Sequence, residues 1–357
     1  MRKRRAAAAA RAAGVEGLLV THLPDVRYLC GFTGSNAALA LAAGRAVLFT
    51  DGRYTVQAKS EAAGTRVVIA TKSVLAAACE WIESAGVKRC GFDAATTTVA
   101  ALEEMRKTVS AKRRQKMFVP VASLAARLRE VKDADEITKI RAAAQMGCRL
   151  FDHMLTVFAP GLTEIAVAAE LEHTARLWGA EAMSFETIVA SGKRGAMPHA
   201  RASKTKLPQR GFVTMDFGVV LDGYMSDMTR TVHMGRARSE ERDVYDAVLA
   251  AQQAGVRAVA PGVTAADVDE AARSVLRGAG LGRYFTHSTG HGVGLDIHEG
   301  PRLAARQTQA LEQGMVITVE PGVYLPDKFG VRIEDMVLVT RSGAEILTPS
   351  VKALIEL

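Results

Sequence analysis

Four acidic residues interrupt apolar segments in the C-terminal two thirds of the chain, and they fall into two pairs. Asp216 and Asp227 flank an Asp-Gly turn dipeptide and are 11 residues apart, a separation that puts both on one face of a two-residue hairpin. Glu320 and Glu334, 14 residues apart around the odd-length loop 326–330, share a face by the same alternation. Because an unpaired buried carboxylate is strongly unfavourable, four that converge stay ionised only around cations. The pattern therefore indicates a metal centre.

A short histidine-rich segment offers a fifth ligand. His287, His291 and His298 are three of the chain's eight histidines and fall within 12 residues, with glycines on both sides of His291. Carboxylates with a single imidazole favour hard or borderline divalent ions, Mn²⁺ first and then Co²⁺ or Zn²⁺, over a thiolate zinc site. Two such ions about 3.5–4 Å apart can lower the pKa of a shared water and polarise a carbonyl oxygen. That combination is the chemistry of a hydrolase.

Competing catalytic motifs are missing from the sequence. Gly290, Gly292 and Gly294 do not have the G-x-G-x-x-G spacing of a dinucleotide loop, and no G-x-S-x-G or P-loop pattern occurs. His298-Glu299 begins like H-E-x-x-H, but Gly300-Pro301 forbids the helix that this motif needs. Serine hydrolase, NTPase and zincin interpretations therefore have no support.

The helices and strands expected to position the acidic residues occur twice along the chain. Ala159-Pro160-Gly161-Leu162-Thr163 recurs 101 residues later as Ala260-Pro261-Gly262-Val263-Thr264, and each copy lies between two segments of helical periodicity. A strand-rich stretch that carries one pair of acids follows each pair of helices. Two copies are too few for a solenoid. We therefore predict one domain with internal pseudo-two-fold symmetry, whose site takes ligands from both halves.

The chain is long enough for two domains, and its local pattern changes near residue 132. Residues 1–130 alternate short apolar runs, such as Phe118–Val121, with helix-length segments, which predicts an α/β layered domain. Asp133 and Glu136 then form an acidic variant of a capping box ahead of a long helix. We expect domains at residues 1–130 and 131–357.

Composition and charge exclude several kinds of partner. Hydrophobic residues make up 48% of the chain and charged residues 24%, the balance of a folded globular protein. Residues 1–130 hold 21 Lys and Arg against 10 Asp and Glu, but the clusters Arg2–Arg5 and Lys112–Lys116 lack the aromatic residues that base stacking uses. No apolar run approaches the ~18 residues of a membrane span. We expect no nucleic acid or membrane partner, and four cysteines without a C-x-x-C pair favour a cytoplasmic location.

The acid pairs, the histidine segment and the duplicated layout together resemble one known family, the proline-specific metallopeptidases of the pita-bread fold, which includes creatinase, aminopeptidase P and prolidase. The resemblance covers nearly the whole chain and implies a creatinase-like α/β N-terminal domain before an α+β pita-bread catalytic domain. It implies that Asp216 binds one metal ion and that His291 and Glu320 bind the other. Asp227 and Glu334 are implied to bridge both ions.

Three further histidines gain roles from the same resemblance. His199, 17 residues before the first acid, and His298, seven residues after the metal histidine, match histidines of the family. A neutral imidazole at either position can donate to an oxyanion or to the proline nitrogen, or shuttle a proton. His287 is implied to line the proline pocket.

Arg332 and Glu320 complete the catalytic set. Arg332, two residues before Glu334, shares a strand face with that acid, so its guanidinium can reach the metal centre and hold a substrate carboxylate or balance charge. The family implies that Glu320 also takes the proton of the attacking water.

Two N-terminal segments, Arg27–Asn36 and Thr50–Tyr54, also resemble the proline-peptidase branch. In that branch the N-terminal domain restricts access to the site and often completes it across a dimer interface. The resemblance therefore implies a homodimer. The alternative is that the two segments are a tight turn and a strand end with no functional role.

The substrate implied is a peptide with proline at its second position. We interpret the protein as an Xaa-Pro aminopeptidase of the aminopeptidase P type, with an Xaa-Pro dipeptidase (prolidase) as the alternative. The two differ in whether the site is open beyond the proline, which depends on loop geometry. A binding module without catalysis is the third class, but five inward-facing polar groups without ions would destabilise a core.

Overall fold

Short apolar runs in the first third of the chain form one six-stranded sheet. The computed structural model describes residues 1–357, and this sheet belongs to the first of two units, Met1–Arg129 and Glu130–Leu357. The strand order is β4-β3-β2-β1-β5-β6. The strands are β1 (Gly17–Val20), β2 (Ala37–Ala42), β3 (Arg45–Asp51), β4 (Arg66–Ala70), β5 (Cys90–Asp93) and β6 (Phe118–Val121).

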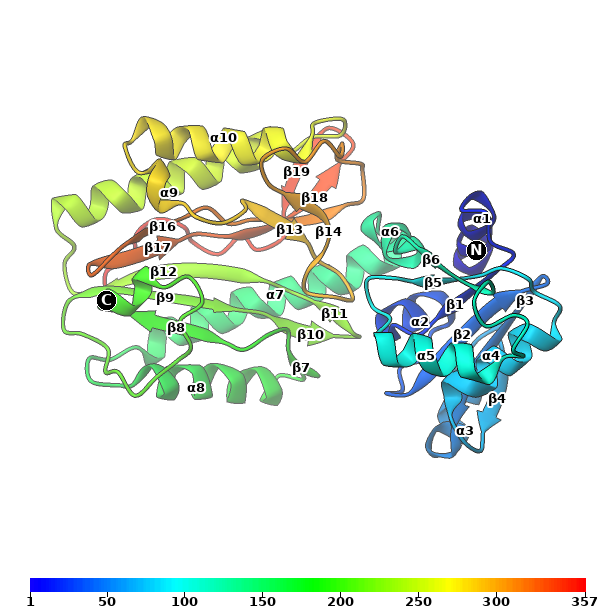
Figure 1. Cartoon of the computed structure of the whole chain (residues 1–357). Coiled ribbons are helices and arrows are strands. Elements are labelled where there is room, and N and C mark those ends of the chain that lie inside the picture. Colours follow the sequence, from blue (N-terminus) through cyan, green and yellow to red (C-terminus); the bar gives the residue numbers. More distant parts are fainter. The chain divides into compact units, whose positions relative to one another are not determined.

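Helices cover both faces of this sheet, which makes the unit an α/β layered domain. Leu19, Phe49 and Ile82 belong to the core beneath α4 and α5, and α1 and α2 contact β1 and β2 (Figure 1). The helices are α1 (Arg2–Ala12), α2 (Leu23–Cys30), α3 (Thr55–Glu61), α4 (Val74–Ser84), α5 (Val99–Thr108) and α6 (Leu124–Glu130). A 3₁₀ turn, η1 (Gly52–Tyr54), follows β3.

The two N-terminal segments singled out by the family resemblance are hydrogen bonded to each other. Asn36 Nδ2 donates to Asp51 Oδ2 at 2.7 Å, and Arg53 Nη2 donates to the same oxygen at 2.9 Å. The hydroxyls of Ser35 and Tyr54 lie 2.6 Å apart. Segments 15 to 19 residues apart in sequence therefore form one polar cluster at the end of β3.

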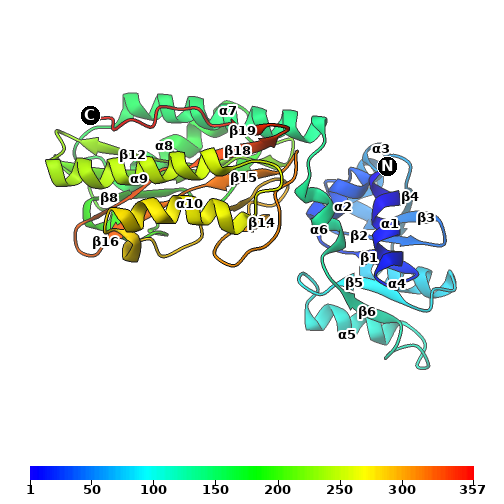
Figure 2. The same cartoon turned by 90° about the horizontal axis from the view of Figure 1, so that it is seen from above.

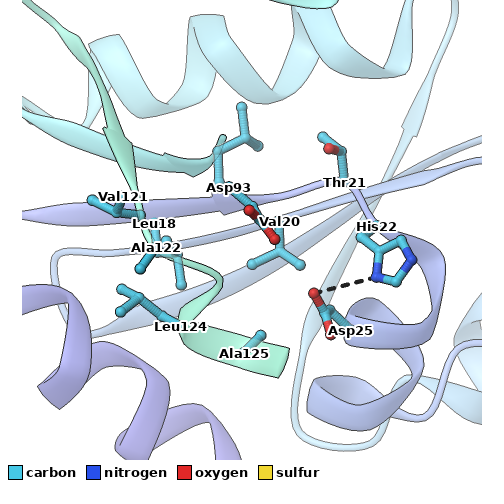
Figure 3. A pocket seen from close by; sticks show the side chains of 11 residues that line it. Leu18, Val20, Thr21, His22, Asp25, Asp93, Val121, Ala122, Leu124 and Ala125 are labelled. Atoms are coloured by element: carbon cyan, nitrogen blue, oxygen red, sulfur yellow. Dashed lines mark ion pairs between the residues drawn. The ribbon is translucent and has the colours of Figure 1, made fainter. Parts of the chain in front are cut away.

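A pocket of about 10 Å³ lies among residues of β1, α2 and α6 (Figure 3). His22 Nδ1 lies 3.4 Å from Asp25 Oδ2 at this pocket, and Arg129 Nη1 donates to Asp25 Oδ1 at 2.7 Å. The pocket has room for about one water. None of the predicted site residues lines it.

The second unit is an internal duplication built on two pairs of helices. In each half the repeated motif forms the turn between the helices, and Thr163 and Thr264 cap the second helix by accepting from Ala166 N and Asp267 N. The predicted capping box of Asp133 is confirmed at the start of the first helix. The helices are α7 (Ala134–Val157) and α8 (Glu164–Leu177) in the first half, and α9 (Ser239–Ala258) and α10 (Ala265–Gly278) in the second.

The strands of this unit lie between the helix pairs, with α7 and α8 on one side and α9 and α10 on the other (Figures 1 and 2). The first half has two three-stranded sheets, and the second has a five-stranded sheet with a separate hairpin. The first-half sheets contain β7 (Ala182–Met183), β8 (Ile188–Ser191), β9 (Gly211–Phe217), β10 (Val219–Leu221), β11 (Tyr224–Met225) and β12 (Met228–Met234). The second-half strands are β13 (Gly290–Gly292), β14 (Glu299–Leu303), β15 (Val316–Val319), β16 (Gly322–Leu325), β17 (Phe329–Arg332), β18 (Asp335–Thr340) and β19 (Gly343–Ile346).

The second unit also contains two 3₁₀ turns, η2 (Gly192–Ala196) and η3 (Gly282–Tyr284).

None of the helices combines the length and the apolar character that a membrane span needs.

Candidate metal centre

Asp216 and Asp227 share a face across paired strands, as their spacing predicts. Asp216 of β9 lies opposite Thr229 of β12, and Asp227 precedes Thr229 by two residues, which makes the two acids diagonal neighbours. The chain between them breaks into a second small sheet after Gly218. A Cβ at Gly218 would lie 1.8 Å from the carbonyl oxygen of Ser226, so only glycine allows this close approach.

Glu320 and Glu334 lie between two paired regions, the β15–β18 ladder and the β16–β17 ladder. Val319 pairs with Asp335 on one side of the gap and Gly322 with Arg332 on the other, so the two glutamates are opposite each other. The hairpin is tighter than predicted, because Leu325 pairs with Phe329 and leaves only residues 326–328 in the turn instead of 326–330. The turn is still odd in length, so the shared face is unchanged.

All nine predicted site residues line a single cavity of about 760 Å³. They are His199, Asp216, Asp227, His287, His291, His298, Glu320, Arg332 and Glu334. Asp227, His291 and Glu334 offer ligand atoms within 4.8 Å of one another. His291 Nε2 lies 3.5 Å from Asp227 Oδ2 and 3.6 Å from Glu320 Oε1. The structure therefore brings both acid pairs and the histidine together.

The crowding of buried acids perturbs their protonation. Burial raises the pKa of Asp227 well above its usual range, and the nearby charges of Glu334, Asp216 and Glu320 raise it further. Burial also raises the pKa of Glu334 well above its usual range, and the nearby charges of Glu320 and Asp216 raise it further. Burial raises the pKa of Glu320 to about 8. These acids stay fully ionised at neutral pH only when cations offset their charge.

His291 is prepared to bind through one nitrogen. Burial lowers its pKa to about 4, so the imidazole is neutral at pH 7. Nδ1 lies 3.0 Å from the carbonyl oxygen of Gly292, an acceptor only, so Nδ1 carries the proton. The lone pair of Nε2 therefore faces the acids.

The donor set fits divalent cations. It combines carboxylate oxygens with one imidazole, and the buried Oδ1 of Asp216 has no hydrogen-bond partner. Two threonines orient the two glutamates, because Thr229 Oγ1 donates to Glu334 Oε2 at 2.7 Å and Thr318 Oγ1 donates to Glu320 Oε1 at 3.3 Å. The unbonded Oδ1 of Asp216 and the oriented glutamates therefore suit the binding of a metal ion.

Arg332 is the buried cation of the cavity. Its side chain is 4% exposed, and Nη2 donates to Asp216 Oδ2 at 2.5 Å, while Nε donates to Thr229 Oγ1 at 3.0 Å. The guanidinium therefore reaches the acids of the centre, as its spacing from Glu334 predicts, and in this position it can balance their charge.

Tyr324 belongs to the same cluster and was missed in the sequence. Arg332 Nη1 donates to Tyr324 OH at 2.8 Å, and Tyr324 OH lies 2.9 Å from His287 Nε2. Because His287 Nδ1 faces the carbonyl oxygen of Ser288, Nε2 is the acceptor and Tyr324 donates. Tyr324 pairs with Gly330 and is diagonal to Arg332, so the parity argument used for the acids would have found it.

The remaining predicted histidines are exposed to the cavity. The ring of His298 lies 4.4 Å from the ring of His291, and burial lowers the pKa of His298. His199 follows Pro198, whose carbonyl oxygen accepts from Arg332 Nη1 at 3.1 Å. Both imidazoles are therefore accessible to a ligand in the cavity.

Arg302 is a second cavity residue that sequence reasoning missed. In the β13–β14 pair it lies opposite His291, so both side chains project to one face, and both line the cavity. Unlike Arg332, Arg302 is exposed.

Acids and a histidine contributed by both halves of a duplicated α+β unit define the class of the pita-bread metallopeptidases. Residues 138–341 match metallopeptidase family M24, and residues 2–131 match the Creatinase/Prolidase N-terminal domain. The chain belongs to metallopeptidase family M24 and is a metal-dependent hydrolase.

Known relatives cover almost the whole chain. A curated Xaa-Pro dipeptidase from Pyrococcus horikoshii is 33% identical over 96% of this chain and 95% of its own length. The solved Xaa-Pro dipeptidase from Bacillus anthracis aligns with a TM-score of 0.96 and 38% identity, covering 100% of this chain and 99% of that one. An X-Pro aminopeptidase from Thermotoga maritima aligns with a TM-score of 0.89 and 33% identity, covering 98% and 100%. These comparisons favour the dipeptidase alternative over the aminopeptidase interpretation.

Proposed function

We propose that this protein is an Xaa-Pro dipeptidase, which hydrolyses the bond between a first residue and proline. The convergence of four carboxylates and one neutral imidazole, that of His291, in a single cavity carries the proposal. The dipeptidases of Pyrococcus horikoshii and Bacillus anthracis support the substrate class. The similar aminopeptidase of Thermotoga maritima supports the second candidate, cleavage of longer Xaa-Pro peptides.

The proposed cofactor is a pair of divalent ions, with Mn²⁺ as the native ion and Co²⁺ or Zn²⁺ as alternatives. Asp216 would hold one ion, and His291 and Glu320 the other. Asp227 and Glu334 would bridge them. When bound, the ions supply an attacking water of lowered pKa and polarise the scissile carbonyl.

The chain's own residues move the protons. Glu320, which is ionised when bound cations offset the charge of the acids, takes the proton of the attacking water. The water oxygen bonds to the carbonyl carbon, and the C–N bond to proline then breaks as the proton passes to the proline nitrogen. His199 and His298 donate to the oxyanion that develops before this bond breaks.

His287 forms the proposed wall of the proline pocket, and the buried ring of Tyr324 packs against it. Burial lowers the pKa of His287 to about 4, and its ring lies 5.1 Å from that of Phe285 and 5.5 Å from that of Tyr324. A neutral, ring-lined surface suits the apolar pyrrolidine.

In this proposal, Arg302 makes the enzyme prefer dipeptides to longer peptides. A dipeptide carries a free carboxylate directly after the proline ring, and that charge needs a cation in the cavity. Arg332 already donates to Asp216 and Tyr324, whereas Arg302 is exposed on the face of His291. We therefore assign the substrate carboxylate to Arg302.

The homodimer implied by the family resemblance remains part of the proposal. Size-exclusion chromatography with light scattering tests it directly, because one chain has a mass of 38.1 kDa. A particle of one-chain mass at all concentrations would remove the dimer from the proposal.

One assay separates the candidate functions. The protein is chelated, reloaded with Mn²⁺ or Co²⁺, and supplied with an Xaa-Pro dipeptide, the same dipeptide with an amidated C-terminus, and an Xaa-Pro-Yaa tripeptide. We expect metal-dependent cleavage of the free dipeptide and much weaker cleavage of the other two. Equal cleavage of the tripeptide would favour the aminopeptidase, and no cleavage with any ion would favour a binding module.

A further inference from the structure

The segment that carries His199 is a long connection between β8 and β9. It runs from residue 192 to residue 210 and contains one 3₁₀ turn, η2, but no strand or α-helix. A connection of this length needs specific ties to hold a side chain in place. His199 itself is exposed, so its own packing does not supply them.

One buried carboxylate binds the chain on both sides of His199. Glu164, the first residue of α8, is 0% exposed, and its Oε1 accepts from Ser191 N at 2.8 Å and from Ser191 Oγ at 2.9 Å. Its Oε2 accepts from Arg194 Nε at 2.9 Å, from Ser203 N at 3.1 Å and from Ser203 Oγ at 2.7 Å. Five donors thus converge on one side chain.

Backbone bonds reinforce the same junction. Glu164 N donates to the carbonyl oxygen of Thr205, and Ile165 N donates to that of Ser203, each at 3.0 Å. On the cavity side, Arg332 Nη1 donates to the carbonyl oxygen of Pro198 at 3.1 Å. The peptide around His199 is therefore held between the start of α8 and the guanidinium of Arg332.

The second half of the duplication uses the same device with different residues. Asp269 of α10 is 1% exposed and accepts from Thr289 N at 3.1 Å and from Thr289 Oγ1 at 2.7 Å. Arg273 binds Asp269 and donates to the carbonyl oxygen of His287 at 2.9 Å. In both halves, a buried acid on the second helix anchors a segment that carries cavity histidines.

We propose that Glu164 is a positioning residue that holds His199 in its place at the cavity. The inference rests on the role of His199 in the proposed function. Glu164 touches neither the cavity nor the acids of the metal centre, so it acts through the 192–203 segment. Displacing a reacting group by about 1 Å can lower the rate about 100-fold.

Glu164→Gln tests the inference with little change in size. An amide nitrogen replaces one acceptor oxygen and faces the donors of Ser191 or of Arg194 and Ser203. We expect kcat to fall about 10- to 100-fold with little change in KM or metal content. Glu170→Gln is the matched control, because Glu170 lies on the same helix, half-exposed, and should leave kcat unchanged.

A double-mutant cycle separates positioning from general damage. If Glu164 acts through His199, adding Glu164→Gln to His199→Ala should lower kcat no further than His199→Ala alone. Multiplicative losses would overturn the inference. Should Glu164→Gln fold poorly, Ser203→Ala removes one of the five donors and serves in the same cycle.

Hydrogen exchange keeps this inference distinct from the proposed function. Amides 195–203 should exchange at least about tenfold faster in Glu164→Gln, whatever the substrate is. Unchanged exchange overturns the positioning role. Faster exchange together with full activity of His199→Ala would instead overturn the role of His199 in the proposed function.

Discussion

The Nη2 atom of Arg332 lies 2.5 Å from Oδ2 of Asp216, and the two residues belong to opposite halves of the duplicated unit. One guanidinium is thus joined to one of four acids, and the other three have raised pKa values. A single buried cation does not balance this charge. Metal binding and the protonation state of the acids are therefore coupled.

Asp227→Asn should lower turnover by about 100-fold or more and reduce the bound metal, because the amide removes an anionic oxygen from the centre. The fold should persist, since Asn keeps the shape of Asp. Activity and metal content measured on the same sample check this. Asp222→Asn, in the turn of the same hairpin, is the control with full activity. Normal metal content and turnover in Asp227→Asn would remove the bridging role.

His199→Ala should lower kcat about 100- to 10,000-fold, the usual size of a lost acid–base group, with bound metal retained. His173→Ala, on the exposed face of α8, provides the comparison. Loss of metal together with activity would show that His199 supports the ions instead of the substrate.

The chelated protein should lose stability as the pH rises from 4.5 to 8. Glu320 has an ordinary pKa of 4.5 and one of about 8 in the folded state, so the folded state binds more protons in this window. The protonated Glu320 contributes fully to the free energy of unfolding below pH 4.5, and this contribution is lost as the pH rises to about 8. Calorimetry should show a Tm that falls with pH in the wild type and falls less in Glu320→Gln.

Excess divalent ion should reverse this trend, because the ions bind the deprotonated acids. The loaded protein should therefore gain stability over the chelated one most strongly at the upper end of the window. Identical pH profiles for the wild type and Glu320→Gln would rule out Glu320 as the titrating group.

Arg302→Ala should raise the KM for an Xaa-Pro dipeptide about 10- to 100-fold, the loss expected for a charged hydrogen bond. The effect on the amidated dipeptide should be small, because that substrate lacks the carboxylate. Arg306→Ala, an exposed arginine three residues beyond β14, is the control. Equal losses on both substrates would contradict carboxylate binding by Arg302.

Local sequence patterns predicted much of the fold, and tertiary context explains the exceptions. Apolar runs marked the strand at Phe118–Val121, and the capping box marked the start of α7. In contrast, β2 has the sequence Ala-Ala-Leu-Ala-Leu-Ala, which favours a helix by propensity. Pairing with β1 and β3 on both sides holds it as a strand.

The sequence by itself determined which acids share a face, because side-chain alternation along a strand is local and depends only on spacing. It did not determine what those acids contact. The bond from Arg332 to Asp216, the contact of Tyr324 with His287, and the ties of Glu164 to Ser191 join residues 27 to 116 positions apart. Such contacts arise only when helices and strands pack, so the tertiary structure alone decided them.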